Sequence, residues 1–152
     1  MAITAFWFGK AFFALANKEI DWLADTIKVA MCTSAYTPAR GTQDYFNDVT
    51  NEVTGTGYTA GGATLTSKTI DIIGIGGLAP TASSIITIDA DDVTWSNSTV
   101  TARYAVVYDD TPVAAVDKPL IGYIDFGEDF ISNDGDFIIT WNSDGIATIT
   151  IA

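Results

Sequence analysis

The sequence predicts a mainly β fold, an antiparallel β-sandwich or barrel-like domain with a short N-terminal helix or arm. Short segments alternate apolar and polar residues, as strands with one buried face do. Turn-forming residues separate these segments, and no long helical pattern alternates with them, which argues against a parallel α/β sheet. We expect residues 1–22 to form the aromatic helix or arm and residues 23–152 a single β domain.

Residues 3–17 are expected to form a short helix. Phe6, Lys10 and Phe13 follow helical spacing, and the alanines among them favour a helix. A strand is the alternative, because aromatic residues also suit strands.

The first strand of the β domain is predicted at residues 26–34. Ile27, Val29 and Met31 alternate there and share one face, whereas Cys32 is interpreted as a small packed residue rather than a reactive thiol. Further strands are predicted at residues 63–73, 84–90, 101–109, 119–126, 136–142 and 146–152.

The connections carry turn-forming residues. Asp134-Gly135 and Asp144-Gly145 are strong hairpin signals, because glycine accepts the positive φ of a tight turn. Loops are predicted at residues 36–48, 74–80 and 109–112.

The composition limits the partners that the protein can have. The chain of 152 residues is 48% apolar and 17% charged, which suggests apolar surface buried against other chains. Its net charge of −12 argues against nucleic acid, which requires a basic face, and against an anionic membrane surface. We therefore expect no nucleic-acid partner and no membrane partner.

The cysteine and histidine counts limit the chemistry. One cysteine and no histidine argue against a disulfide framework and a zinc site, and exclude a nucleophile activated by histidine. Two carboxylates would suffice for a glycosidase, but no spacing pairs two acids in a cleft. We expect no cofactor, no metal and no enzymatic activity. The apolar start of the chain lacks a small-residue cleavage site, so we expect no signal peptide, and no apolar run approaches the length of a membrane span.

The glycine-rich stretch GTGYTAGGATL at residues 55–65 raises the question of a phosphate-binding loop. Its spacing lacks the third glycine of a dinucleotide fingerprint and the lysine of a P-loop, and a strand-like segment follows it. We interpret these glycines as turn and bulge residues. Asp89, Asp91 and Asp92 resemble Ca²⁺ ligands, but the glycine and closing glutamate of an EF-hand are missing, so a solvated acidic turn is the favoured interpretation.

The aromatic residues near the N-terminus are the strongest candidates for a binding role. Core packing is one interpretation, and burial against another chain is the other, because aromatic residues contribute most per residue at interfaces. The candidate residues for a capsid or subunit interface are Phe6, Trp7, Phe8, Phe12, Phe13 and Tyr58.

Long blocks of the chain resemble a family of small structural proteins of tailed bacteriophages. The similarity runs through IDWLADTIKVAMCTSAYTP, DYFNDVTNEVTGTGYTAGGATL, DADDVTW, ARYAVVYDDT and PLIGYIDFG, in that order. The aromatic start and the IIGIGGLAPTASSI segment depart from the family pattern.

The resemblance implies a virion component made with the head genes in the host cytoplasm. We expect a capsid decoration (cement) protein on the outer surface of the head, bound to the major capsid protein and to itself, with a trimer favoured. The alternative is a tail, fibre or neck module that binds a host-surface glycan by stacking sugars on Tyr36, Tyr45, Tyr58 or Trp95.

Overall fold

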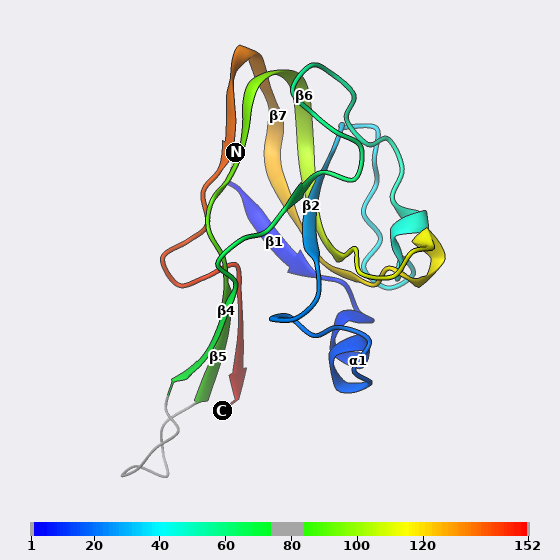
Figure 1. The fold of residues 1–152 in the computed structure, drawn as a ribbon, viewed down its shortest axis with the longest axis vertical. Coiled ribbons are helices and arrows are strands. Elements are labelled where there is room, and N and C mark those ends of the chain that lie inside the picture. Colours follow the sequence, from blue (N-terminus) through cyan, green and yellow to red (C-terminus); the bar gives the residue numbers. More distant parts are fainter. Residues whose placement is uncertain (1, 74–83, 152) are drawn as a thin grey trace.

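The computed structural model describes residues 2–73 and 84–151 (Figure 1). It contains two antiparallel sheets and one short α-helix near the N-terminus, so the predicted fold class is confirmed. The loop predicted at residues 74–80 lies outside the described residues.

The larger sheet has five strands in the order β1-β7-β6-β2-β3. Its strands are β1 (Thr4–Trp7), β2 (Ile27–Cys32), β3 (Ala63–Thr64), β6 (Val93–Asp109) and β7 (Leu120–Ile139). The smaller sheet has the order β4-β5-β8 and contains β4 (Thr69–Ile73), β5 (Ser84–Asp89) and β8 (Ala147–Ile151). Two single 3₁₀ turns, η1 (Phe46–Asp48) and η2 (Ala115–Asp117), lie in the loops.

Strands β6 and β7 form one long bent ribbon. The sequence predicts two strands, at 119–126 and 136–142, with a hairpin turn at Asp134-Gly135, and this prediction is wrong. Asp134 and Gly135 lie inside β7, where Gly135 pairs with Ser98 of β6. The positive φ values of Asp134 and Asn97 mark a bulge on each strand, and a bulged ribbon can bend and pass from one layer to the other. Figure 1 shows both strands reaching this bend at the top of the molecule.

The strand predicted at 63–73 is divided between the two sheets. β3 pairs with β2, β4 pairs with β5, and Ser67 with a φ of 52° turns the chain between them. The prediction of one continuous strand is therefore wrong. A turn forms at Asp144-Gly145, where the Gly145 N–H donates to the Asn142 carbonyl at 2.8 Å. The hairpin predicted there is wrong, because β8 pairs with β5 of the smaller sheet and not with β7.

The N-terminal segment is a strand followed by a helix. The helix predicted at 3–17 is right for α1 (Ala11–Ala16) and wrong for β1, which pairs with β7 from Thr4↔Asp125 to Trp7↔Gly122. These residues form a strand because their side chains alternate between the two faces of the sheet. Phe8 packs on one face of the larger sheet, whereas Trp7 packs on the other. The edge of β7 also offers backbone groups that an N-terminal helix would leave unpaired.

Both faces of the larger sheet are apolar. The larger core cluster fills the space between this sheet, the smaller sheet and the loops, and includes Trp22, Val29 and Trp95. The smaller cluster lies on the opposite face, where Phe8, Cys32 and Tyr36 are buried. Burial raises the pKa of the Cys32 thiol to about 12, so this residue is a packed thiol.

Candidate docking surface

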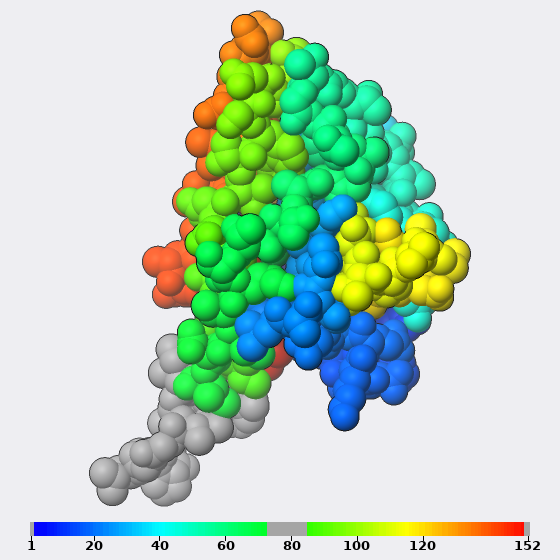
Figure 2. Space-filling view, in the orientation of Figure 1, coloured from blue at the N-terminus to red at the C-terminus, as the bar shows by residue number. Residues whose placement is uncertain are grey.

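The aromatic residues predicted to form an interface lie in different environments. Phe12 and Phe13 on α1 are 43% and 59% exposed, whereas Phe8 is fully buried. Phe6 and Trp7 are half-buried on β1, and the Trp7 ring packs on Phe12 with centroids 4.9 Å apart. Figure 2 shows α1 as the dark-blue lobe at the lower right of the molecule. Trp7, Phe12 and Phe13 can therefore contribute to a surface, whereas Phe8 belongs to the core.

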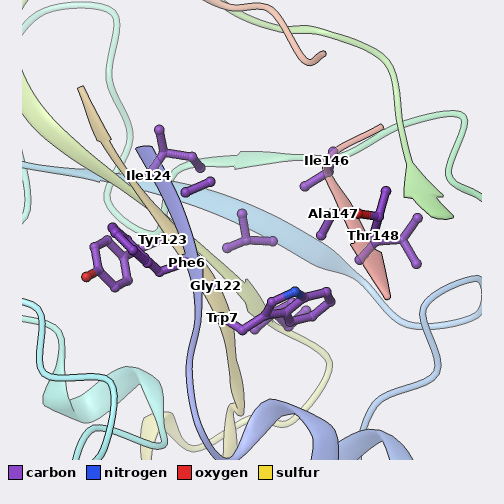
Figure 3. A pocket seen from close by; sticks show the side chains of 12 residues that line it. Phe6, Trp7, Gly122, Tyr123, Ile124, Ile146, Ala147 and Thr148 are labelled. Atoms are coloured by element: carbon purple, nitrogen blue, oxygen red, sulfur yellow. The ribbon is translucent and has the colours of Figure 1, made fainter. Parts of the chain in front are cut away.

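Trp7 also lines an apolar groove of about 230 Å³. The groove lies between residues 5–7 of β1, residues 121–124 of β7 and residues 146–148 at the start of β8 (Figure 3). These three segments are far apart in the sequence, and the two sheets bring them together.

A second groove of about 440 Å³ shares Ala5, Ile124 and Ile146 with the first. Exposed Ile3 and Ile138 lie along it. None of the described residues that line either groove is charged, although the chain contains 19 acidic and seven basic residues. We call the two grooves together the uncharged groove.

Two strand edges flank the uncharged groove. β1 is an edge strand of the larger sheet, and β8 is an edge strand of the smaller sheet. The Phe8 N–H donates to the Ile121 carbonyl at 3.1 Å, and hydrogen-bonded pairs alternate along an antiparallel ladder. Ala5 and Trp7 therefore direct their backbone N–H and C=O groups away from β7. Such an edge can bind an added strand.

Tyr58 faces inward rather than toward a partner. Its hydroxyl accepts a hydrogen bond from the Met31 N–H at 3.0 Å and donates to the Glu52 carboxylate at 2.6 Å. Burial, followed by the bond to Glu52, raises the pKa of this phenol well above its usual range. Glu52 also accepts from the Gly61 N–H at 2.6 Å, so Tyr58 and Glu52 fix the glycine-rich turn to β2.

The four rings considered for sugar stacking are mostly occupied within the chain. Tyr36 and Trp95 are buried and present no face to a ligand. Tyr45 is half-buried, and its ring lies 3.9 Å from the Lys10 ammonium. The Tyr58 ring faces Trp95 with centroids 6.1 Å apart.

The carboxylates of the acidic turn at residues 89–95 accept hydrogen bonds from other groups of the same chain. Asp91 Oδ2 accepts hydrogen bonds from the hydroxyls of Thr66 and Ser67, and Asp92 Oδ1 accepts the Trp141 N–H at 2.9 Å. Within residues 2–73 and 84–151, no group of three or more Asp, Glu or Cys side chains is arranged to hold a metal ion. No helix in this described part of the chain is long and apolar enough to cross a membrane.

Comparison of the chain with family models, with curated proteins and with solved structures finds no match. The assignment of the candidate site therefore rests on the geometry of the chain alone. Sequence reasoning found Trp7, Phe12 and Phe13 but missed Ala5, Ile124 and Ile146. No local signal marks these three residues. The pairing of β1 with β7 places Ala5 opposite Ile124, and the contact between the two sheets brings Ile146 beside them.

Proposed function

We propose that the protein is a non-enzymatic decoration protein of a bacteriophage head, which docks on the outer surface of the shell through the uncharged groove. The observation that carries the proposal is an uncharged apolar groove bordered by free strand edges on a chain with a net charge of −12. Contiguous exposed apolar surface on a soluble protein is typical of an interaction site. The resemblance of the long sequence blocks to phage structural proteins supports the head as the location.

The partner that this geometry fits is an extended apolar segment of the major capsid protein. Such a segment would add its backbone to the free edge of β1 and place alternate side chains in the groove. The ring of Trp7 and the exposed rings of Phe12 and Phe13 would extend the contact, because large aromatic residues dominate interface energetics.

The charge of the protein supports the outer rather than the inner surface of the shell. The packaged genome is a polyanion, and a chain with a net charge of −12 is repelled by it. A protein that binds only the assembled shell stabilises that state by mass action, in proportion to its affinity and concentration. We propose that it contacts neighbouring capsid subunits in this way and acts as a homo-oligomer. A trimer is the assembly that the resemblance favours.

Ala5 offers a direct test, because it is exposed and lines both halves of the groove. Purified protein is mixed with undecorated heads of the parent phage, and the bound fraction is measured by sedimentation. We expect the wild type to saturate the heads at a copy number comparable to that of the major capsid protein. Ala5→Arg should weaken binding by at least about tenfold, because a charge then enters an apolar contact.

Thr101→Arg is the matched control. Thr101 is exposed on β6 and lines neither half of the groove. The Thr101→Arg variant should bind undecorated heads with wild-type affinity. A folded Ala5→Arg variant with wild-type affinity would exclude the groove as the docking surface. Failure of the wild type to bind heads, or a copy number of only a few per virion, would exclude the decoration function and favour a tail module.

A further inference from the structure

Both arginines of the chain stack on aromatic rings of the larger sheet, on the face opposite the Trp7 ring. The Arg40 guanidinium lies 4.6 Å from the centre of the Phe6 ring, and the Arg103 guanidinium lies 5.5 Å from the Tyr104 ring. Tyr123 connects the two pairs, with centroids 5.3 Å from Phe6 and 6.5 Å from Tyr104. We call these five residues the arginine–aromatic strip.

The register of the sheet places the strip on one face. Phe6 of β1 pairs with Tyr123 of β7, and Tyr104 of β6 pairs with Asp125 of β7. Figure 3 shows the Phe6 and Tyr123 rings on one side of β1, and Ile146 to Thr148 beyond its other side. The aromatic rings of the strip are half-buried. They therefore retain area that a partner can cover.

The charges of the strip differ at its two ends. Arg40 at the Phe6 end is exposed and forms no ion pair with any residue of the described chain. Arg103 at the Tyr104 end is neutralised by Asp125, with Nε and Oδ1 2.7 Å apart. Exposed Asp129 also lies near Arg103 and acts on it electrostatically. Among the described residues its carboxylate accepts one weak hydrogen bond, from the Ser34 hydroxyl at 3.4 Å. One end of the strip is thus positive, and the other end is negative.

We infer that the arginine–aromatic strip is a self-complementary contact between two copies of this chain, related by a twofold axis through its aromatic centre. A twofold axis pairs each end of a patch with the opposite end of its copy. Arg40 of each copy then meets Asp129 of the other, and the rings of Phe6, Tyr104 and Tyr123 pack across the axis. Arginine and aromatic residues are also the types enriched at such contacts.

Charge complementarity favours a second copy as the occupant of this strip. A partner must supply carboxylates opposite Arg40 and a cation opposite Asp129, and the strip itself supplies both in reversed order. The net charge of −12 on each copy opposes association, but this repulsion is screened beyond about 8 Å at physiological salt, whereas contact pairs are screened less. The inference does not rest on the proposed docking on a phage head, although Phe6 and Tyr123 also line the uncharged groove. The twofold contact departs from the threefold assembly expected from the resemblance.

The test is the oligomeric state of the purified full chain at physiological salt, measured by analytical ultracentrifugation over a range of concentrations. We expect a species with twice the mass of the 16.1 kDa chain. Arg40→Glu should raise the dissociation constant of this dimer at least tenfold, because it places two carboxylates opposite each other. Adding Asp129→Arg to Arg40→Glu should restore the dimer by reversing both charges.

Lys18→Glu is the control for net charge. Lys18 is exposed and has no ion pair among the described residues, so this variant changes the total charge as Arg40→Glu does and should remain a dimer. Far-ultraviolet circular dichroism verifies that each variant is folded. A wild-type monomer at all concentrations, a wild-type trimer, a folded Arg40→Glu dimer of unchanged affinity, or a folded double variant that stays monomeric would each overturn the twofold contact. None of these results bears on head binding, which the Ala5→Arg experiment measures separately.

Discussion

The carboxyl group of Asp109 is an unusual component of the core. Asp109 is fully buried at the end of β6, where its Oδ1 accepts the Thr111 N–H at 2.8 Å and its Oδ2 has no partner within the described chain. Burial raises the pKa of Asp109, the Thr111 N–H and hydroxyl oppose this shift, and the nearby Asp25 carboxylate adds to it. The neighbouring cations are engaged elsewhere: Lys68 donates to the Asp25 carbonyl, and Lys28 and Lys118 pair with Asp110.

The raised pKa of Asp109 predicts a pH-dependent stability. The folded state binds its proton more tightly than the unfolded state does, so the contribution of Asp109 is fully present below the ordinary value of 3.8 and is lost as the pH rises through the raised pKa. Asp109→Asn should remove this loss and flatten the pH profile above 3.8. At neutral pH the variant should gain up to about 1–3 kcal/mol, because the unpartnered carboxylate oxygen becomes an amide N–H donor that can bond to the nearby Asp25 carboxylate. Urea unfolding at several pH values measures both effects.

Asp110→Asn provides the control of opposite sign. Burial opposes ionisation of Asp110, but hydrogen bonds from Lys118 and Lys28 outweigh it and lower its pKa. Its contribution is therefore present above 3.8 and lost as the pH falls through the lowered pKa, so this variant should be less stable at neutral pH. A pH profile of Asp109→Asn that matches the wild type would show that Asp109 is not the titrating group.

At the residue scale, the sequence indicated where unusual side chains lie but not what they contact. The distinctive block around Tyr58 was identified as a turn, yet the partners of its hydroxyl lie on β2 and at Glu52, and no local pattern encodes a contact across 27 residues. The sequence also contains no indication that Asp109 is buried, because residues 109–112, DDTP, have the composition of a solvated loop.

At the scale of elements, alternation predicted strands well and their continuity poorly. The alternation at β2 and the glycine turns at residues 55–62 are as predicted, because both depend on local residue preferences. The continuity of β7 through Asp134-Gly135 depends instead on its pairing with β6. One extra residue of β6 at residues 96–97 is offset by one extra residue of β7 at residues 133–134, so the pairing continues past both bulges. The β1 strand likewise forms because an unpaired edge of β7 lies beside it, and a single sequence does not show that edge.

The close approach of the glycine turn to β2 predicts a large effect of one methyl group. Gly62 has a φ of 76°, and a Cβ atom there would lie 1.8 Å from the Val29 carbonyl oxygen. Gly62→Ala should therefore strain the backbone and push the turn away from β2, lowering the free energy of unfolding by at least about 2 kcal/mol. Chemical denaturation monitored by tryptophan fluorescence measures the change.

Gly41→Ala is the matched control, because no heavy atom of the described residues, apart from its chain neighbours, lies within 4 Å of the added methyl group. This variant should change the free energy of unfolding by less than about 0.5 kcal/mol. Equal stability of the two variants would mean that the glycine turn does not pack on β2 as described.

At the scale of the whole molecule, the sequence predicted the class of the fold and the charge of the surface, but not the site. The net charge of −12 and the apolar content follow from the residue counts alone, so they do not depend on topology. The uncharged groove does depend on topology, because β1 must pair with β7 and the smaller sheet must then bring residues 146–148 beside that pair. The aromatic N-terminal segment contributes to both the core and the groove, and its sequence does not separate these two roles.

Two phenylalanines of this segment allow the two roles to be separated by experiment. Phe8 is fully buried in the smaller core cluster, whereas Phe13 is 59% exposed on α1. Phe8→Ala should cost about 3–5 kcal/mol through the lost burial and the cavity left behind, which lowers the melting temperature by on the order of 10 °C in a domain of this size. Phe13→Ala should leave the melting temperature within about 2 °C of the wild type.

The same two variants should rank in the opposite order in the head-binding assay. At a temperature where both are folded, Phe13→Ala should bind undecorated heads more weakly than the wild type, because an exposed ring of the docking surface is removed. Phe8→Ala should bind normally, because its ring lies on the face of the larger sheet opposite the groove. If the folded Phe8→Ala variant lost head binding while Phe13→Ala retained it, α1 would not border the docking surface, and the contact with the head would lie on the opposite face of the molecule.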